Sequence, residues 1–226
     1  LARLAETVDA AGLTLGVVES IPVHEDVKLG RPTRERYADA FCAGIEAMGA
    51  LGIPVLCYNF MPVFDWTRTD LARVGADGAT ALAYDDAALA RIDLSQGTGD
   101  LPGWATAYDA PALAALLAAY RAVDAEALWE HLAWFLARVV PVAEAAGVRL
   151  ALHPDDPPWP ILGLPRIVGS GAALARVCDL VDSPANGVTF CTGSLGADPA
   201  NDLPAIARAL GARGRVHFVH GRNVRV

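Results

Sequence analysis

Three residues able to bind a metal ion close short apolar runs of the kind found in buried strands: His153, Cys191 and His220. Neighbouring parallel strands bring their carboxyl ends to one edge of a sheet, so these side chains could converge on a single cation. Imidazole nitrogen and thiolate sulfur suit zinc or ferrous iron, and the ligands alone do not name the metal. Each histidine taken singly is more often a hydrogen-bonded core residue; the three together make a metal site the working hypothesis.

Carboxylates that could complete such a site lie nearby. Asp155 and Asp156 follow His153 directly, and Glu19 ends an earlier apolar run. Each could instead stay solvated or accept hydrogen bonds from backbone N–H groups in a turn. Four prolines between residues 154 and 160 remove backbone donors and stiffen the segment after the histidine.

Side-chain alternation along the last predicted strand favours His220 over His217 as a ligand. If Val216, Phe218 and His220 point into a barrel, His217 points toward the surrounding helices. By the same rule Thr189 faces inward with Cys191.

Strands and helices alternate along most of the chain. Predicted strands occupy residues 13–20, 54–60, 148–153, 187–191 and 216–220. Predicted helices occupy residues 2–11, 33–51, 125–147, 171–181 and 202–211. Such alternation demands a parallel sheet with helical crossovers.

The even repeat favours a (β/α)8 TIM barrel, which needs eight strands and typically about 250 residues. No GxGxxG motif follows the first strand, which argues against a dinucleotide-binding fold. We expect residues 1–226 to form one barrel domain that is incomplete at both ends, with a natural polypeptide longer than this chain. Residues 72–124 interrupt the repeat, and we expect a helical insertion there that acts as a lid.

Composition limits the classes of partner. The chain is 54% hydrophobic and carries a net charge of -8, with 18 basic and 26 acidic residues, and Lys28 is its one lysine. We therefore expect no nucleic-acid partner and no membrane association. The absence of a signal-peptide pattern and of CxxC spacing among the four cysteines predicts a cytoplasmic protein without disulfides.

Long stretches of this chain resemble mannonate dehydratases. They are VVESIPVHEDVKLG, VLCYNFMPVFDWTRTDL, LALHPDDPPWPILGLPRIV, NGVTFCTGSLGADPANDLPAIA and RVHFVHGRNV. The resemblance extends over nearly the whole chain and rests on long strings rather than on short motifs.

This resemblance implies a TIM barrel of the xylose-isomerase-like group that converts D-mannonate to 2-keto-3-deoxy-D-gluconate and water. It implies a manganese or ferrous ion held by two histidines, a cysteine and an aspartate, of which His153, Cys191 and His220 match the first three. The aspartate and an acid/base histidine and tyrosine would follow Val226. We also expect a homo-oligomer.

Five further residues are candidates for substrate contacts. Arg222 and Arg68 could meet the carboxylate or hydroxyls of a sugar acid, because a guanidinium fork suits that geometry. Each arginine could equally form a surface ion pair. Glu19, His24 and Asn59 are candidate partners for substrate hydroxyls.

Two alternative functions remain open at this stage. One is a metal-dependent sugar isomerase or epimerase with the same barrel, although a cysteine ligand argues against it. The other is a sugar-acid binding protein without turnover, because no complete acid/base pair can be assigned in the chain.

Overall fold

The computed structural model describes residues 1–94 and 108–226. Its main sheet has five strands in the order β1-β2-β5-β6-β7, and every neighbouring pair is parallel. The strands are β1 (Val17–Glu19), β2 (Val55–Tyr58), β5 (Arg149–Leu152), β6 (Asn186–Cys191) and β7 (Val216–His220). The five predicted strands are thus confirmed, with somewhat shorter bounds.

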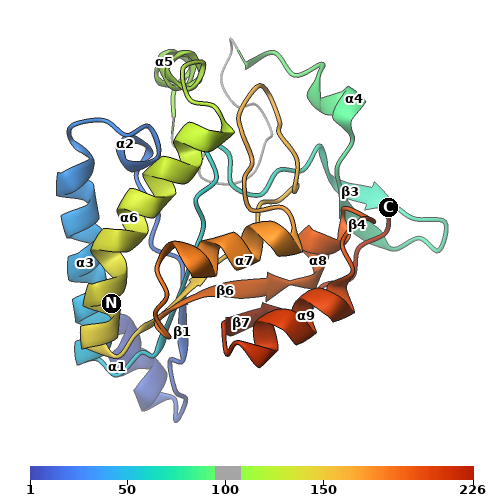
Figure 1. The fold of residues 1–226 in the computed structure, drawn as a ribbon. Coiled ribbons are helices and arrows are strands. Elements are labelled where there is room, and N and C mark those ends of the chain that lie inside the picture. The colour runs from blue at the N-terminus through green and yellow to red at the C-terminus, as the bar shows by residue number, and fades with distance from the viewer. Residues whose placement is uncertain (95–107) are drawn as a thin grey trace.

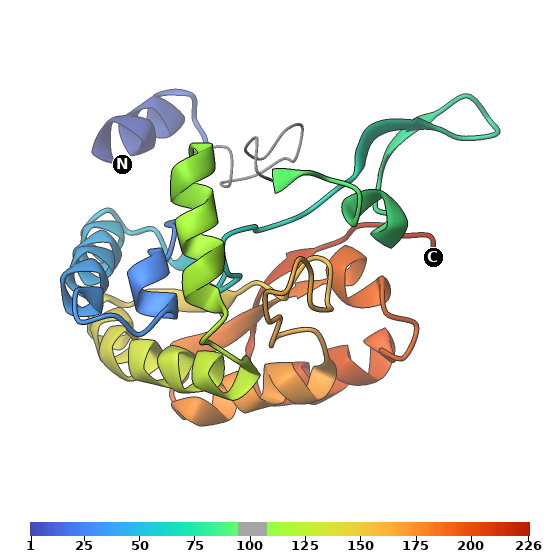
Figure 2. The same ribbon diagram turned by 90° about the horizontal axis from the view of Figure 1, so that it is seen from above.

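Helices cover one face of this sheet, and the sheet curls around its other face (Figures 1 and 2). The helices that follow the strands in the chain are α3 (Arg34–Ala50), α6 (Ala125–Ala146), α7 (Gly171–Leu180) and α9 (Leu203–Ala212). Three others are α1 (Ala2–Ala10), α2 (Glu25–Lys28) and α8 (Thr192–Gly196). A curled parallel sheet with helices outside confirms the predicted α/β barrel architecture, and the described residues supply five strands to it.

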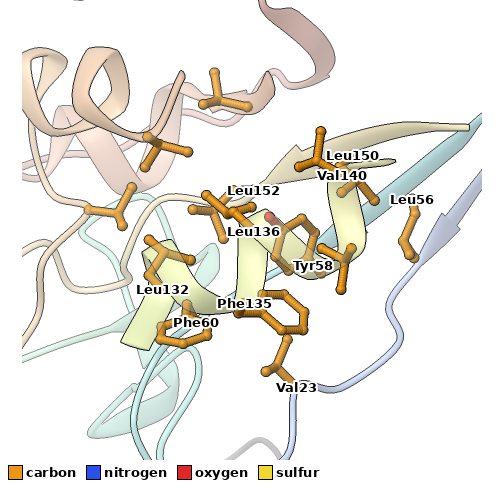
Figure 3. Packing of buried hydrophobic residues seen from close by; sticks show 14 of the residues in the cluster. Val23, Leu56, Tyr58, Phe60, Leu132, Phe135, Leu136, Val140, Leu150 and Leu152 are labelled. Atoms are coloured by element: carbon orange, nitrogen blue, oxygen red, sulfur yellow. The ribbon is translucent and has the colours of Figure 1, made fainter. Parts of the chain in front are cut away.

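The longest helix, α6, shows why the sequence folds in this way. The Asp124 carboxylate accepts a hydrogen bond from the Ala127 N–H and caps its start, and Gly147 ends it at φ 69°. The apolar face of α6 is buried against the sheet (Figure 3). Its side chains Leu132, Phe135, Leu136 and Val140 pack over Leu56 and Tyr58 of β2 and Leu150 and Leu152 of β5. Burying each such side chain contributes about 1.5–3 kcal/mol, so this face anchors the two central strands.

The opposite face of the sheet is also apolar but smaller. Val55, Cys57 and Ala151 form a buried cluster with Val17 and Phe218 packed against it. Because strand residues alternate between faces, this cluster lies on the concave side, below the strand ends that carry the candidate ligands.

One prediction about β7 was wrong. The register shifts between the pairs Val188–Val216 and Thr189–Phe218, so β7 carries one extra residue at that point. Val216 packs against the helix-side core rather than facing inward. The ring of His217 lies against Gly187, where the Cβ of any larger residue would come within 2.4 Å of it, and Gly187 shares a face with Thr189.

The predicted insertion at residues 72–124 holds a hairpin as well as helices. Antiparallel strands β3 (Asp70–Val74) and β4 (Thr80–Ala83) project from the body (Figure 2), followed by α4 (Asp86–Leu89) and α5 (Ala110–Tyr120). Residues 95–107 of the predicted insertion lie outside the described residues. The role of this segment as a lid stays a prediction.

Across residues 1–94 and 108–226, every helix is too short or too polar to span a lipid bilayer.

Candidate metal centre

The carboxyl ends of three adjacent strands bring the predicted ligands together. Cys191 and His220 are paired in register at the ends of β6 and β7, and His153 comes directly after β5. One donor atom from each of His153, Cys191 and His220 lies within 4.8 Å of the others. Convergence of the three side chains, inferred from strand order, is therefore seen in the structure.

The outer nitrogen of each histidine has a partner that can only accept a hydrogen bond. His153 Nδ1 lies 2.7 Å from the carbonyl oxygen of Pro154, and His220 Nε2 lies 3.0 Å from Oε2 of Glu19. Both outer nitrogens must therefore carry the hydrogen. In neutral rings the inner nitrogens, His153 Nε2 and His220 Nδ1, are left with bare lone pairs.

These two inner nitrogens are only 3.1 Å apart. Two lone pairs at that separation repel unless a proton or a cation lies between them. Two ligands that share one ion at about 2.1 Å are about 3.0 Å apart in octahedral and about 3.4 Å apart in tetrahedral coordination. The observed spacing therefore fits two imidazoles bound to one metal ion.

The third donor, Cys191, is surrounded by groups that favour its thiolate form. Its Sγ lies 3.2 Å from the Ser194 hydroxyl, 3.5 Å from the Ser194 N–H and 3.1 Å from a guanidinium nitrogen of Arg222. Burial opposes the charged form, but the hydrogen bond and charge of His153, with the bonds from Ser194, lower the pKa of the Cys191 thiol to about 5. A thiolate is the form of cysteine that binds metals.

A second group of donors, Glu19, Cys57 and His220, also lies within 4.8 Å. Cys57 is a weaker candidate than Cys191, because its Sγ is 3.2 Å from the Thr189 hydroxyl and burial raises the pKa of its thiol to about 12. This group therefore offers a neutral thiol where the first offers a thiolate.

Beside the centre, Asp156 holds both arginines that were predicted to bind substrate. Arg68 contacts its two carboxylate oxygens at 2.7 and 3.1 Å, and Arg222 contacts Oδ2 at 2.8 Å. The Ser194 hydroxyl lies 3.0 Å from the same oxygen, so its single hydrogen is shared between this carboxylate and Cys191 Sγ. Burial opposes ionisation of Asp156, but the bonds and charges of Arg68 and Arg222 lower its pKa to about 2. Their role as substrate contacts stays a prediction.

A family model described as D-mannonate dehydratase (UxuA) matches residues 1–226. The chain belongs to the D-mannonate dehydratase family. It is 48% identical over 222 residues to mannonate dehydratase 2 of Halalkalibacterium halodurans, a match that covers 98% of this chain and 64% of that protein. It is 50% identical over 224 residues to a mannonate dehydratase of Streptococcus uberis, with 99% of this chain and 64% of that protein covered.

Solved structures agree with this membership. The crystal structure of mannonate dehydratase from Streptococcus suis serotype 2 matches 99% of this chain and 60% of its own, with a TM-score of 0.90 and 44% identity. A D-tagatose 3-epimerase-like protein, with a TM-score of 0.53 and 15% identity, shares the fold alone. The chain thus spans about 64% of the length of the curated relatives that it matches.

Two of the predicted substrate contacts lie at a separate cleft of about 340 Å³ in this member of the family. His24 and Asn59 line it together with Lys28, Tyr37 and Tyr108. His24 also caps α2, because its Nδ1 accepts a hydrogen bond from the Asp26 N–H at 3.1 Å. The cleft could hold a polar ligand, since charged and hydroxyl groups line part of an otherwise apolar wall.

Sequence reasoning missed a buried ionic cluster at the edge of this cleft. Glu25 contacts Lys28 Nζ at 2.7 Å, the Tyr120 hydroxyl at 2.5 Å and the Val63 N–H at 3.3 Å. The spacing of three residues between Glu25 and Lys28 could have indicated the ion pair. Tyr120 lies 95 positions away in the chain, and nothing in the sequence pattern indicated it.

Proposed function

We propose that the protein dehydrates D-mannonate to 2-keto-3-deoxy-D-gluconate with the help of a divalent ion, Mn²⁺ or Fe²⁺. The observation that carries the proposal is the pair of inward-facing nitrogens on His153 and His220 beside the Cys191 thiolate. Family membership supports the choice of substrate.

His153, Cys191 and His220 would hold the ion. When bound, such an ion stabilises negative charge that develops on an adjacent carboxylate or enolate oxygen. The Cys191 thiolate lowers the net charge of the centre, and the Ser194 and Arg222 contacts keep its sulfur oriented. The carbonyl of Pro154 accepts a hydrogen bond from His153 Nδ1 and so leaves Nε2 of that ring available to the ion.

Dehydration of mannonate removes the proton from C2 and expels the C3 hydroxyl as water. The enol that forms becomes the 2-keto acid by tautomerisation. A base must reach C2 and an acid must protonate the leaving hydroxyl. We assign neither role to a residue of this chain.

Substrate hydroxyls would lie toward the cleft that His24 and Asn59 line, and the Arg68 and Arg222 guanidinium groups border the centre from the side of Asp156. Binding of a sugar-acid carboxylate by either arginine would compete with Asp156 for the same N–H groups. We therefore expect these arginines to affect the affinity for mannonate more than the choice of ion.

The function is tested by incubating the full-length, chelator-treated protein with D-mannonate and measuring 2-keto acid formation with and without added Mn²⁺. We expect product only when the ion is present. Equal rates without any divalent ion would contradict the proposal, and an epimeric sugar acid in place of the 2-keto product would favour the isomerase alternative.

A homo-oligomer and a cytoplasmic location also remain proposals. The hairpin of β3 and β4 exposes Leu71, Val74 and Leu82, and exposed apolar side chains of this kind often lie in contact surfaces. Light scattering on the purified protein would measure its mass in solution.

A further inference from the structure

Glu19 and His220 lie at opposite edges of the five-stranded sheet and yet touch. Glu19 ends β1, the first strand in the sheet order, and His220 ends β7, the last. Curling of the sheet brings Glu19 Oε2 to 3.0 Å from His220 Nε2. The two residues are 201 positions apart in the chain, so the tertiary fold, and not the local sequence, brings them together.

This contact determines which nitrogen of His220 can bind an ion. A carboxylate accepts hydrogen bonds and does not donate, so the hydrogen of this contact lies on His220 Nε2. His220 Nδ1 is then the nitrogen with a free lone pair, and it faces His153 at 3.1 Å. The opposite tautomer would direct an N–H group at the place where the ion must lie.

We propose that Glu19 is a positioning residue that fixes the tautomer and orientation of His220 and thereby sets the affinity of the centre for its ion, without binding the ion itself. This inference rests on the proposed metal-dependent function. A carboxylate behind a ligating histidine raises the basicity of the imidazole and holds its ring in place, and loss of such a partner typically weakens metal binding about 10–100-fold.

Direct ligation by Glu19 is the alternative, since Glu19, Cys57 and His220 also form a group of potential donors. An ion among these three would require His220 to bind through Nε2. Each side of His220 offers three potential donors, but the side that faces His153 includes the Cys191 thiolate, whereas the other side includes a Cys57 thiol that is hydrogen-bonded to the Thr189 hydroxyl at 3.2 Å. The ion therefore belongs on the Nδ1 side and Glu19 on the Nε2 side.

Glu19 can be replaced without disturbing the core. Its side chain is 45% exposed, and β1 is the edge strand of the sheet. A change there removes little packing, so an effect on metal binding would not arise through unfolding.

The experiment compares Glu19→Ala, Glu19→Gln and wild type in the full-length protein by titration with Mn²⁺, with free Mn²⁺ measured by electron paramagnetic resonance. Glu19→Ala should weaken binding about 10–100-fold. Glu19→Gln should lose less than about tenfold, because its amide oxygen still accepts the hydrogen bond from Nε2. Glu46→Gln, an exposed carboxylate on α3, is the matched control and should bind as wild type does.

Substitution with Co²⁺ adds a readout of the ligand set. Glu19→Ala should keep the thiolate-to-cobalt charge-transfer band, which shows that Cys191 remains bound and that only the surroundings of His220 have changed. Equal losses in Glu19→Ala and Glu19→Gln, together with an altered cobalt spectrum, would make Glu19 a ligand and overturn the inference. Unchanged affinity in Glu19→Ala would overturn it as well.

His153→Ala separates this inference from the proposed function. If His153→Ala loses Mn²⁺ binding and Glu19→Ala does not, the centre exists and only the role of Glu19 is wrong. If His153→Ala binds Mn²⁺ as tightly as wild type, the centre itself is wrong, and the inference fails with it.

Discussion

His153 Nε2 and His220 Nδ1 face each other at 3.1 Å. In each ring the other nitrogen donates a hydrogen bond, to the Pro154 carbonyl and to the Glu19 carboxylate respectively. Hydrogen-bonding chemistry alone then requires a positive charge between the rings. Burial opposes a charge on His153, but the hydrogen bond and charge of Cys191 raise the pKa of its imidazole and so favour a positive charge at this place. A divalent ion would supply that charge and bind the thiolate directly.

Cys191→Ser should lower the affinity for Mn²⁺ at least tenfold, because a serine hydroxyl is a far poorer anionic ligand than a thiolate. The variant should stay folded, since the change removes no side-chain carbon. Metal content after dialysis and the far-ultraviolet circular dichroism spectrum would measure both effects.

Cys42→Ser is the matched control, because Cys42 lies on α3, away from the centre, and is partly exposed. It should bind Mn²⁺ like wild type. Equal metal content in the two serine variants would remove Cys191 from the ligand set.

Asp156→Asn should destabilise the protein at neutral pH and have less effect in acid. The folded-state pKa of Asp156 is lowered from 3.8 to about 2, so its stabilisation is present above the unfolded value and is lost as pH falls through the folded value. The shift corresponds to about 2 kcal/mol. Urea unfolding should show a difference in unfolding free energy between wild type and variant that is about 1 kcal/mol smaller at pH about 3 than at pH about 7, because pH 3 lies between the two pKa values and only about half of the stabilisation is lost there.

Asp39→Asn serves as a control for this pH series, because the Asp39 carboxylate is exposed and pairs with Arg138 at the surface. Surface ion pairs contribute about 0–1 kcal/mol to stability. The difference in unfolding free energy between wild type and Asp39→Asn should therefore be small at both pH values. If the difference in unfolding free energy between wild type and Asp156→Asn stayed constant with pH, the ionised carboxylate of Asp156 would not stabilise the fold through its two arginines.

Tyr120→Phe should lower the free energy of unfolding by about 1–3 kcal/mol, because it removes a buried hydrogen bond to the Glu25 carboxylate. Hydrogen exchange should become faster in α5, which ends at Tyr120, and should not change in α6. Tyr37→Phe is the control, since Tyr37 contacts His24 through ring stacking at 3.4 Å. An equal loss of unfolding free energy in both variants would indicate that the Tyr120 hydroxyl does not hold α5 in place.

The sequence predicted the features that depend on local periodicity. Alternation of strand and helix located all five strands of the main sheet, and the buried face of α6 follows from apolar residues at helical spacing. The order of strands then brought His153, Cys191 and His220 together, since ends of adjacent parallel strands share one edge.

Features that depend on a distant partner could not be predicted. The extra residue in β7 that moves His217 is defined by pairing with β6, and periodicity along one strand does not reveal it. The pairing of Arg68 and Arg222 with Asp156 is likewise tertiary, because an arginine's spacing in the chain does not say which carboxylate it will meet. The β3–β4 hairpin lacks a buried face, so its apolar pattern carried little signal.

The position of the ion tests the central claim most directly. Crystals of the protein soaked in Mn²⁺ should give one anomalous-difference peak about 2.0–2.5 Å from His153 Nε2, His220 Nδ1 and Cys191 Sγ. A peak bonded instead to His220 Nε2, Glu19 and Cys57, or no peak at either place, would contradict the account.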